Sequence, residues 1–179
     1  IPILRMGNIR DGRLDLSDLK YVDPQDKDIA KCTLQRGDVL INRTNSPELV
    51  GKAALFDCDG TYAFASYLIR LRPHPNATLP TFINFAINSM LGREHVQAVK
   101  HQVAGQANIN TGDIRSMPIP LPPIYEQERI VAKIDALFAR ADAIEAAVEA
   151  VRRRADKIEQ SILARAFRAV YRSGVGDRL

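Results

Sequence analysis

The sequence predicts an α+β fold in which a globular, mixed α/β domain is followed by one long, coiled-coil-forming helix. A proline cluster marks the division, because four prolines within residues 118–123 exclude a helix interior and favour extended chain. Beyond it, residues 126–172 contain neither Pro nor Gly, whereas both are scattered through the preceding residues. We therefore expect a globular domain over 1–122, a long helix over 123–172 and a short tail over 173–179.

Short apolar runs bounded by turn residues predict three strands in the first part, over 38–41, 50–56 and 68–72. Apolar and basic residues alternate near the end of the third run. This alternation predicts that Ile69 and Leu71 point inward, while Arg70 and Arg72 point outward.

Two helices are expected next. Pro80 suits a first helical turn, and the apolar residues that follow it at helical spacing predict a helix through Leu91. A shorter helix is predicted over 94–101. Residues 105–112 are polar and bounded by glycines, so we expect a loop there.

The long helix carries apolar residues whose spacing alternates between four and three. They are Ile130, Ile134, Leu137, Ala141, Ile144, Val148, Val151, Ala155, Ile158 and Ile162. This alternation forms one seam on a helix wound at about 3.5 residues per turn, as in a coiled coil. Such a helix would span roughly 70 Å, whereas a domain of this size has a radius of gyration of only ~14 Å. We therefore expect the seam to pair, in either direction, with a second copy or a missing part of the same subunit. The alternative is a helix that packs on its own domain.

The composition excludes several classes of protein. Of the 179 residues, 46% are hydrophobic and 26% charged, with a net charge of +4. This is ordinary for a globular domain and unlike collagen, a disordered tail or a disulfide-stapled miniprotein. No apolar run reaches the ~18 residues of a membrane helix, and no charged-then-apolar leader precedes Ile-Pro-Ile. We expect an internal fragment of a cytoplasmic protein, with no membrane segment or secretory signal. The mild positive charge permits a polyanionic partner without requiring one.

The motifs of common catalytic and metal sites are missing. Gly51-Lys52-Ala53 lacks the first glycine and the hydroxyl of a phosphate-binding loop, and no glycine-rich nucleotide turn follows a strand. The three histidines have no zinc-ligand spacing. Cys32 and Cys58 form no CxxC pair, and they predict either two buried thiols or a disulfide. We predict no catalytic residue, no metal site and no enzyme activity in this chain.

Three stretches together resemble one family. They are Gly37–Arg43 with Val50–Phe56, then Gly105–Pro120, and then Ile119–Ile130. The most specific is the junction Pro-Leu-Pro-Pro-x-x-Glu-Gln-x-x-Ile, which opens the long helix. Over nearly its whole length the chain resembles half of a specificity (S) subunit of a type I restriction-modification enzyme.

The resemblance implies a function and a set of partners. In that family each subunit holds two target recognition domains, each followed by a long helix, and the two helices pair antiparallel. Each domain reads one half of a split sequence in double-stranded DNA. The implied partners are methyltransferase subunits and, through the complex, restriction subunits. S-adenosylmethionine, ATP and Mg²⁺ would belong to those partners, and this chain would bind no cofactor itself.

Polar side chains that leave the expected strands and helices are the candidate DNA contacts. Lys and Arg bind phosphates, whereas the planar ends of Arg, Asn and Gln match base edges in the major groove. The candidates are Arg43, Asn45, Ser46, Lys52, Arg70, Lys100, Gln102, Gln106 and Asn108.

Most of these candidates have a structural alternative. Arg43 could form a salt bridge with Asp38 or Glu48, and Asn45 and Ser46 could form a turn before Pro47. Arg70 and Arg72 could occupy a solvated strand face. For Gln106 and Asn108, phosphate positioning or domain closure is favoured over base reading, because their Gly-Gln-x-Asn segment resembles a loop of family members.

The leading functional hypothesis is a non-catalytic DNA sequence-recognition subunit that docks methyltransferase subunits. The alternative is a coiled-coil assembly module without DNA specificity. A third possibility is a fragment of a fused enzyme whose catalytic half lies elsewhere.

Overall fold

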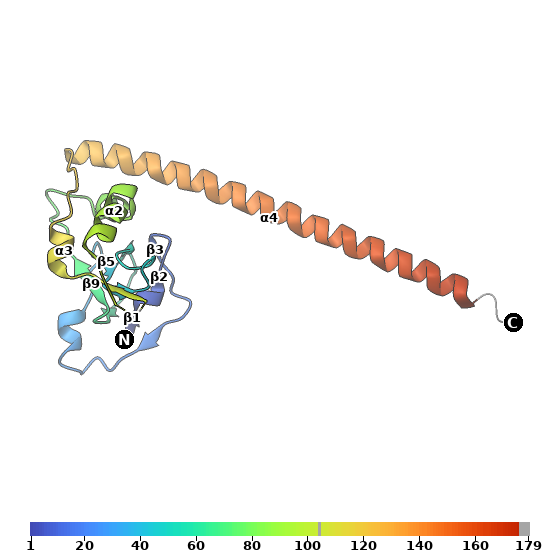
Figure 1. Cartoon of the computed structure of the whole chain (residues 1–179), viewed down its shortest axis with the longest axis horizontal. Helices are drawn as coiled ribbons and strands as arrows, with labels where there is room; N and C mark the ends of the chain where they lie inside the picture. The colour runs from blue at the N-terminus through green and yellow to red at the C-terminus, as the bar shows by residue number, and fades with distance from the viewer. Residues whose placement is uncertain (104, 176–179) are drawn as a thin grey trace. The chain divides into compact units, whose positions relative to one another are not determined.

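A computed structural model describes residues 1–103 and 105–175 (Figure 1). The chain divides into two compact units, Ile1–Val131 and Ala132–Leu179. The first is mixed α/β and the second is helical, so the predicted fold class is confirmed. Of the expected tail over 173–179, residues 176–179 lie outside the described residues.

Three antiparallel strands form the central sheet of the first unit. β5 (Val39–Asn42) lies between β7 (Ala53–Leu55) and β9 (Leu68–Leu71). These strands confirm the three predicted ones, although the second is shorter than expected. All four residues of β5 are buried, because each face of the sheet is covered by an apolar cluster.

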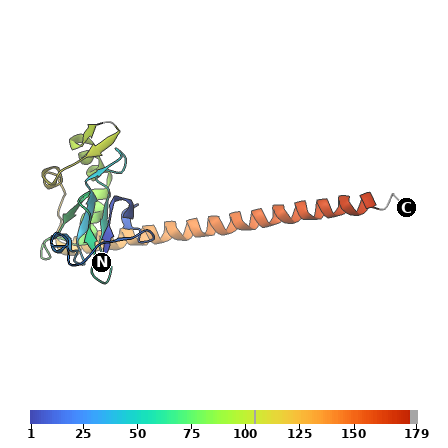
Figure 2. The same ribbon diagram turned by 90° about the horizontal axis from the view of Figure 1, so that it is seen from below.

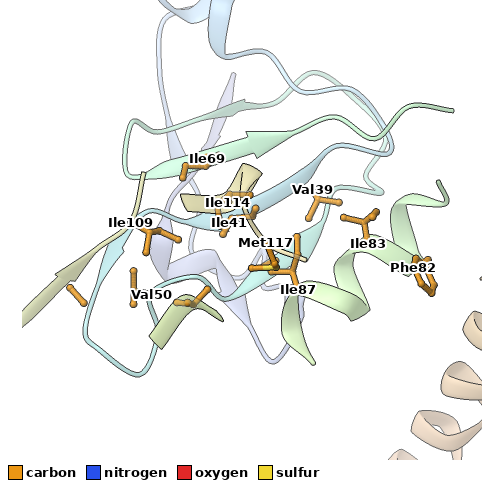
Figure 3. Packing of buried hydrophobic residues seen from close by; sticks show 13 residues of the cluster. Val39, Ile41, Val50, Ile69, Phe82, Ile83, Ile87, Ile109, Ile114 and Met117 are labelled. Carbon is orange, nitrogen blue, oxygen red and sulfur yellow. The ribbon is translucent and has the colours of Figure 1, made fainter. Parts of the chain in front are cut away.

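The two clusters lie on opposite faces of β5. The larger contains Val39 and Ile41, together with Ile69 of β9 and Ile83 and Ile87 of the first helix (Figure 3). The smaller contains Leu40, Leu4, Phe56 and Leu68. A strand buried on both faces shows a continuous apolar run, as residues 39–41 do.

Several short strands surround this sheet. β1 (Pro2–Leu4) pairs antiparallel with β4 (Lys20–Tyr21) and parallel with β8 (Ala63–Phe64). The remaining strands are β2 (Ile9–Arg10), β3 (Arg13–Leu14), β6 (Thr44–Asn45), β10 (His101–Val103) and β11 (Gln106–Asn108). Two short 3₁₀ helices, η1 (Met6–Asn8) and η2 (Ile29–Cys32), join the N-terminal strands.

The helices of the first unit correct two predictions. α1 (Pro80–Asn88) begins at Pro80 as expected but ends at Asn88, and α2 (Met90–Val99) starts directly after it. Ser89 separates them because its backbone is extended, and its hydroxyl caps α2 by accepting from the Gly92 amide. The single helix through Leu91 and the later start at Glu94 were therefore wrong.

The expected loop over 105–112 was also wrong, because it contains β11 and the start of α3 (Thr111–Arg115). Asn110 and Asp113 form a reciprocal capping box at the start of α3. The Asn110 Oδ1 accepts from the Asp113 amide at 3.1 Å, and the Asp113 carboxylate accepts from the Asn110 amide at 2.7 Å. This capping pair was present in the sequence as a helix-start signal.

α4 (Ile124–Val175) is one unbroken helix, as Figure 2 also shows. It confirms the predicted long helix but continues past Gly174, so the expected end at Arg172 was wrong. Gln127 in its first turns is fully buried. The Gln127 amide donates to the carbonyls of Ala77 and Pro122, and its Oε1 accepts from the Leu79 amide at 2.9 Å. These bonds explain the glutamine of the junction motif.

Cys32 and Cys58 are both free thiols and only partly buried, so the disulfide alternative was wrong. Burial raises the pKa of the Cys58 thiol. Among the helices that the structure describes, none has the length and hydropathy needed for a membrane span. Within the same residues, no group of three His, Cys, Asp or Glu side chains could hold a metal ion.

Candidate nucleic-acid interface

Three segments that are far apart in the sequence form one small sheet, in the order β10-β11-β6. Ala107 of β11 lies opposite both Gln102 of β10 and Asn45 of β6. The two neighbours of Ala107 are Gln106 and Asn108. The structure therefore brings together four candidates that come from separate segments of the sequence.

The four candidates divide between the two faces of this sheet. Successive side chains of a strand point to opposite faces, and residues paired across strands share a face. Ala107 is fully buried in the larger core cluster, so Gln102 and Asn45 lie on its face. Gln106 and Asn108 are exposed on the opposite face. Together these two form an exposed amide edge.

The turn after β6 is anchored to α2. The Arg93 guanidinium donates to the Val50 carbonyl at 2.8 Å and to the Glu48 carbonyl at 2.9 Å. Gly51 has a φ of +73°, and a Cβ there would lie 2.6 Å from side-chain carbons of Val96. The turn thus holds β6 in a fixed place against the helix. Nothing in the spacing of Arg93 distinguished it from a solvent-facing helix residue.

The structure supports the turn interpretation of Asn45 and Ser46. The Asn45 Oδ1 accepts from the Ser46 amide at 2.8 Å. A hydrogen bond with the Ser46 hydroxyl is the main cause that lowers the pKa of Glu48. The backbone amide of Glu48 and the positive charge of Lys100 lower this pKa further. Lys100 itself follows the end of α2 and donates to the Gln97 side chain. These residues form the polar corner between β6 and α2.

Arg43 is exposed, and no ion pair joins it to a carboxylate within residues 1–103 and 105–175. The expected alternative, a salt bridge to Asp38 or Glu48, was wrong. Asp38 is almost fully buried and forms an ion pair with Arg72. The Arg43 guanidinium therefore remains a candidate for phosphate contact.

Arg70 is held within the domain, so the solvated-face alternative was wrong for this residue, whereas Arg72 is exposed and ion-paired. The Arg70 guanidinium donates to the Thr33 carbonyl at 2.8 Å and lies 5.3 Å from the ring centre of Phe64. Arg72 binds Asp38 through two hydrogen bonds of 2.7 and 2.9 Å. This paired geometry is typical of a structural ion pair.

A groove of about 730 Å³ adjoins the small sheet through Asn45. Of the other candidates, Lys52 also lines it. Sequence reasoning missed its remaining cations, Arg5 and Arg10, and the half-exposed ring of Tyr67. Arg5 and Arg10 belong to the N-terminal segment, where the short strands gave no periodic signal.

The seam of α4 is the second candidate surface. Ile130 packs against the larger core cluster of the first unit, and Ile134 is partly buried. The large apolar residues that follow are between 56% and 65% exposed: Leu137, Ile144, Val148, Val151, Ile158 and Ile162. Ala141 and Ala155 on the same seam are also exposed. A contiguous apolar stripe of this kind marks an interaction surface.

Comparison with known proteins identifies the family. Residues 1–151 match the type I restriction modification DNA specificity domain, and the chain belongs to this family. It is 35% identical over 93% of its length to the type I restriction enzyme EcoKI specificity subunit of Escherichia coli K12. It is 33% identical over 94% to the StySPI specificity subunit of Salmonella potsdam. The chain spans only 36% and 37% of those two relatives.

Two solved structures share the fold. An HsdS subunit from Thermoanaerobacter tengcongensis matches 80% of this chain and 37% of its own, with a TM-score of 0.63 and 24% identity. A chain from a structural study of complex assembly and conformational transition in the type I R-M system matches 92% of this chain and 42% of its own. Its TM-score is 0.71, with 23% identity.

Proposed function

We propose that this chain is the non-catalytic DNA sequence-recognition part of a type I restriction-modification system. It reads one half of a bipartite target in double-stranded DNA. It docks methyltransferase subunits and, through them, restriction subunits, and it acts in the cytoplasm. S-adenosylmethionine, ATP and Mg²⁺ are bound by those partner subunits. The observation that carries the proposal is the gathering of Asn45, Gln102, Gln106 and Asn108 on one small sheet of a specificity-domain fold.

The side chains around this sheet suit the two tasks of a DNA reader. Arg43 and Lys100 are cations that can bind phosphates, a contact that sets affinity and depends on salt, whereas Lys52 is paired with Asp11. Gln106 and Asn108 expose planar amides on one face. Such amides can position a phosphate, the role favoured by the family resemblance, or form paired hydrogen bonds with adenine. Since Arg70 is held inside the domain, we assign it a structural role.

The exposed seam of α4 supports a role in pairing. Burying its apolar side chains against a second helix removes them from water, which is favourable in proportion to the area covered. The partner is a second copy of this chain or the other half of the same subunit. Either arrangement places two recognition domains on one DNA duplex, which a bipartite target requires.

The test is binding of the full chain, with its methyltransferase subunits, to a library of double-stranded DNA with randomised positions. We expect enrichment of a bipartite sequence, with affinity that falls steeply as salt rises. Replacing Gln106 and Asn108 together by Ala should weaken binding to the selected sequence by about 10-fold or more. Gln160→Ala, an exposed amide on the far side of the α4 seam, is the matched control.

A second candidate function is favoured by the same exposed seam, namely a coiled-coil assembly module without DNA specificity. A protein of that kind would pair stably through α4. It would enrich no DNA sequence and would show no salt-dependent affinity for DNA. The absence of any enriched sequence would therefore contradict the DNA-reading function and favour this alternative.

A further inference from the structure

The groove beside the small sheet carries balanced charge. Three ion pairs line it: Arg5 with Asp18 at 3.0 Å, Arg10 with Asp15 at 3.2 Å, and Lys52 with Asp11 at 4.0 Å. Asp18 also lies 3.9 Å from Lys20, which is not among the residues that line the groove. No other lining residue carries a formal charge. The groove therefore holds three cations and three carboxylates, in contrast to the net positive surface that a phosphate-binding groove presents.

Two of the three carboxylates are open to a ligand. The side chains of Asp11 and Asp18 are 96% and 75% exposed. Asp15 is more enclosed, and hydrogen bonds from the Ser17 hydroxyl and amide hold its pKa below the ordinary value. Exposed ion pairs contribute little free energy, so Asp11 and Asp18 can accept new hydrogen bonds at small cost.

The fold fixes both open carboxylates in place. Asp11 and Gly12 have φ angles of +49° and +78° and form the two-residue turn between β2 and β3. The Asn84 amide of α1 holds this turn by donating to the Gly12 carbonyl at 3.0 Å. On the other side, the buried Asn8 amide donates to the Asp18 carbonyl at 3.0 Å. Such preorganisation reduces the entropic cost of binding.

We propose that this charge-balanced groove is a base-reading site, in which Asp11 and Asp18 accept hydrogen bonds from exocyclic amino groups of adenine or cytosine. Carboxylates repel phosphates but match the amino donors that these two bases present in the major groove. Asn45 of the small sheet also lines this groove. This inference rests on the proposed function.

In this proposal the paired cations and the carboxylates have different roles. Arg5 and Lys52 neutralise the carboxylates, so the groove adds little to salt-dependent affinity and instead decides between sequences. Loss of a carboxylate leaves its cation unpaired. Removing Asp18 should therefore strengthen binding to random DNA while weakening the preference for the selected sequence.

The experiment uses the full chain with its methyltransferase subunits and the randomised duplex library. Asp18→Ala and Asp11→Gly remove the carboxylate acceptor, and glycine adopts the positive φ at position 11 without strain. At one base pair of the selected site, we expect each variant to lose about 10-fold in discrimination and to bind random duplex more tightly. Asp28→Ala is the matched control, because Asp28 forms an exposed ion pair with Lys31 outside the groove.

Base analogues identify which amino group is read. Purine lacks only the amino group of adenine, and 2-pyrimidinone lacks only that of cytosine. One of the two should weaken DNA binding by the wild type and leave binding by the matching Asp11 or Asp18 variant unchanged. If the wild type selects a sequence and both variants select it with the same discrimination, the groove proposal is overturned and the DNA-reading function stands. If the wild type selects nothing, both fail.

Discussion

The domain over 1–131 and the helical unit that follows it differ in how far their side chains are buried. In the domain, buried polar groups such as Asp38 and Gln127 have partners within the domain itself. In the helix, residues such as Ile144 and Val151 remain about two-thirds exposed. The contrast shows that the domain's core is built from its own residues, whereas the seam of the helix is exposed to solvent in this chain, as the proposed pairing requires.

The sharpest way to test this contrast is to place a charge on the seam. Ile144→Asp puts a carboxylate where a paired helix would bury it, and burial of an unpaired charge is costly. We expect the paired state to be lost, with at least a 100-fold rise in the concentration needed for pairing, about 2.7 kcal/mol. Light scattering and analytical ultracentrifugation measure this change.

Ala146→Asp is the matched control for the seam. It introduces the same carboxylate within the same helical turn but away from the seam, at an exposed position. It should leave the mass unchanged. An unchanged mass for Ile144→Asp as well would show that the seam does not pair.

A change inside the domain should act on folding and leave pairing intact. Arg72→Met removes the partner of the buried Asp38 carboxylate, and an unpaired buried charge lowers the free energy of unfolding by about 3 kcal/mol. Urea denaturation measures the loss. Arg10→Met breaks the more exposed pair with Asp15 and should cost less than about 1 kcal/mol. Equal losses for the two variants would contradict the structural role of Arg72.

The start of α4 offers a third test, because Gln127 belongs to the domain although it lies on the helix. Gln127→Leu leaves the Leu79 amide and the carbonyls of Ala77 and Pro122 without their partner. We expect the free energy of unfolding to fall by about 2 kcal/mol. Gln160→Leu on the exposed part of the helix should change stability little, and denaturant midpoints compare the two.

The smallest effect concerns acid stability. The pKa values of Asp15 and Glu48 are lowered in the folded chain, chiefly by hydrogen bonds from Ser17 and Ser46. Their stabilising contribution is therefore complete above the ordinary values of 3.8 and 4.5. It is lost as pH falls through the lowered folded values.

Thermal melting between pH 7 and pH 3 measures this loss. The melting temperature should change little down to about pH 5 and then decrease. Glu48→Gln should reduce that decrease, whereas Glu149→Gln on the helix should not. An identical pH profile for Glu48→Gln and the wild type would contradict the role of Glu48.

The candidate site shows where sequence reasoning stopped. The sequence identified Asn45, Gln102, Gln106 and Asn108 as polar residues but placed two of them in a loop. Their meeting on one sheet depends on strand pairing between distant segments, which no local pattern encodes. The groove was missed for the same reason, because its charged side chains come from residues 5–18 and from Lys52, which lies far from them in the sequence.

By itself, the sequence determined the central strands, the long helix and its apolar seam. Each of these follows from the order of neighbouring residues, because helical and strand periodicity act locally. Only the tertiary structure decided that Arg72 binds Asp38 and that Gln127 anchors the helix. It also decided that cationic and carboxylate side chains line the groove in equal number. Those contacts join residues far apart in the chain, and their geometry is set by how the whole domain packs.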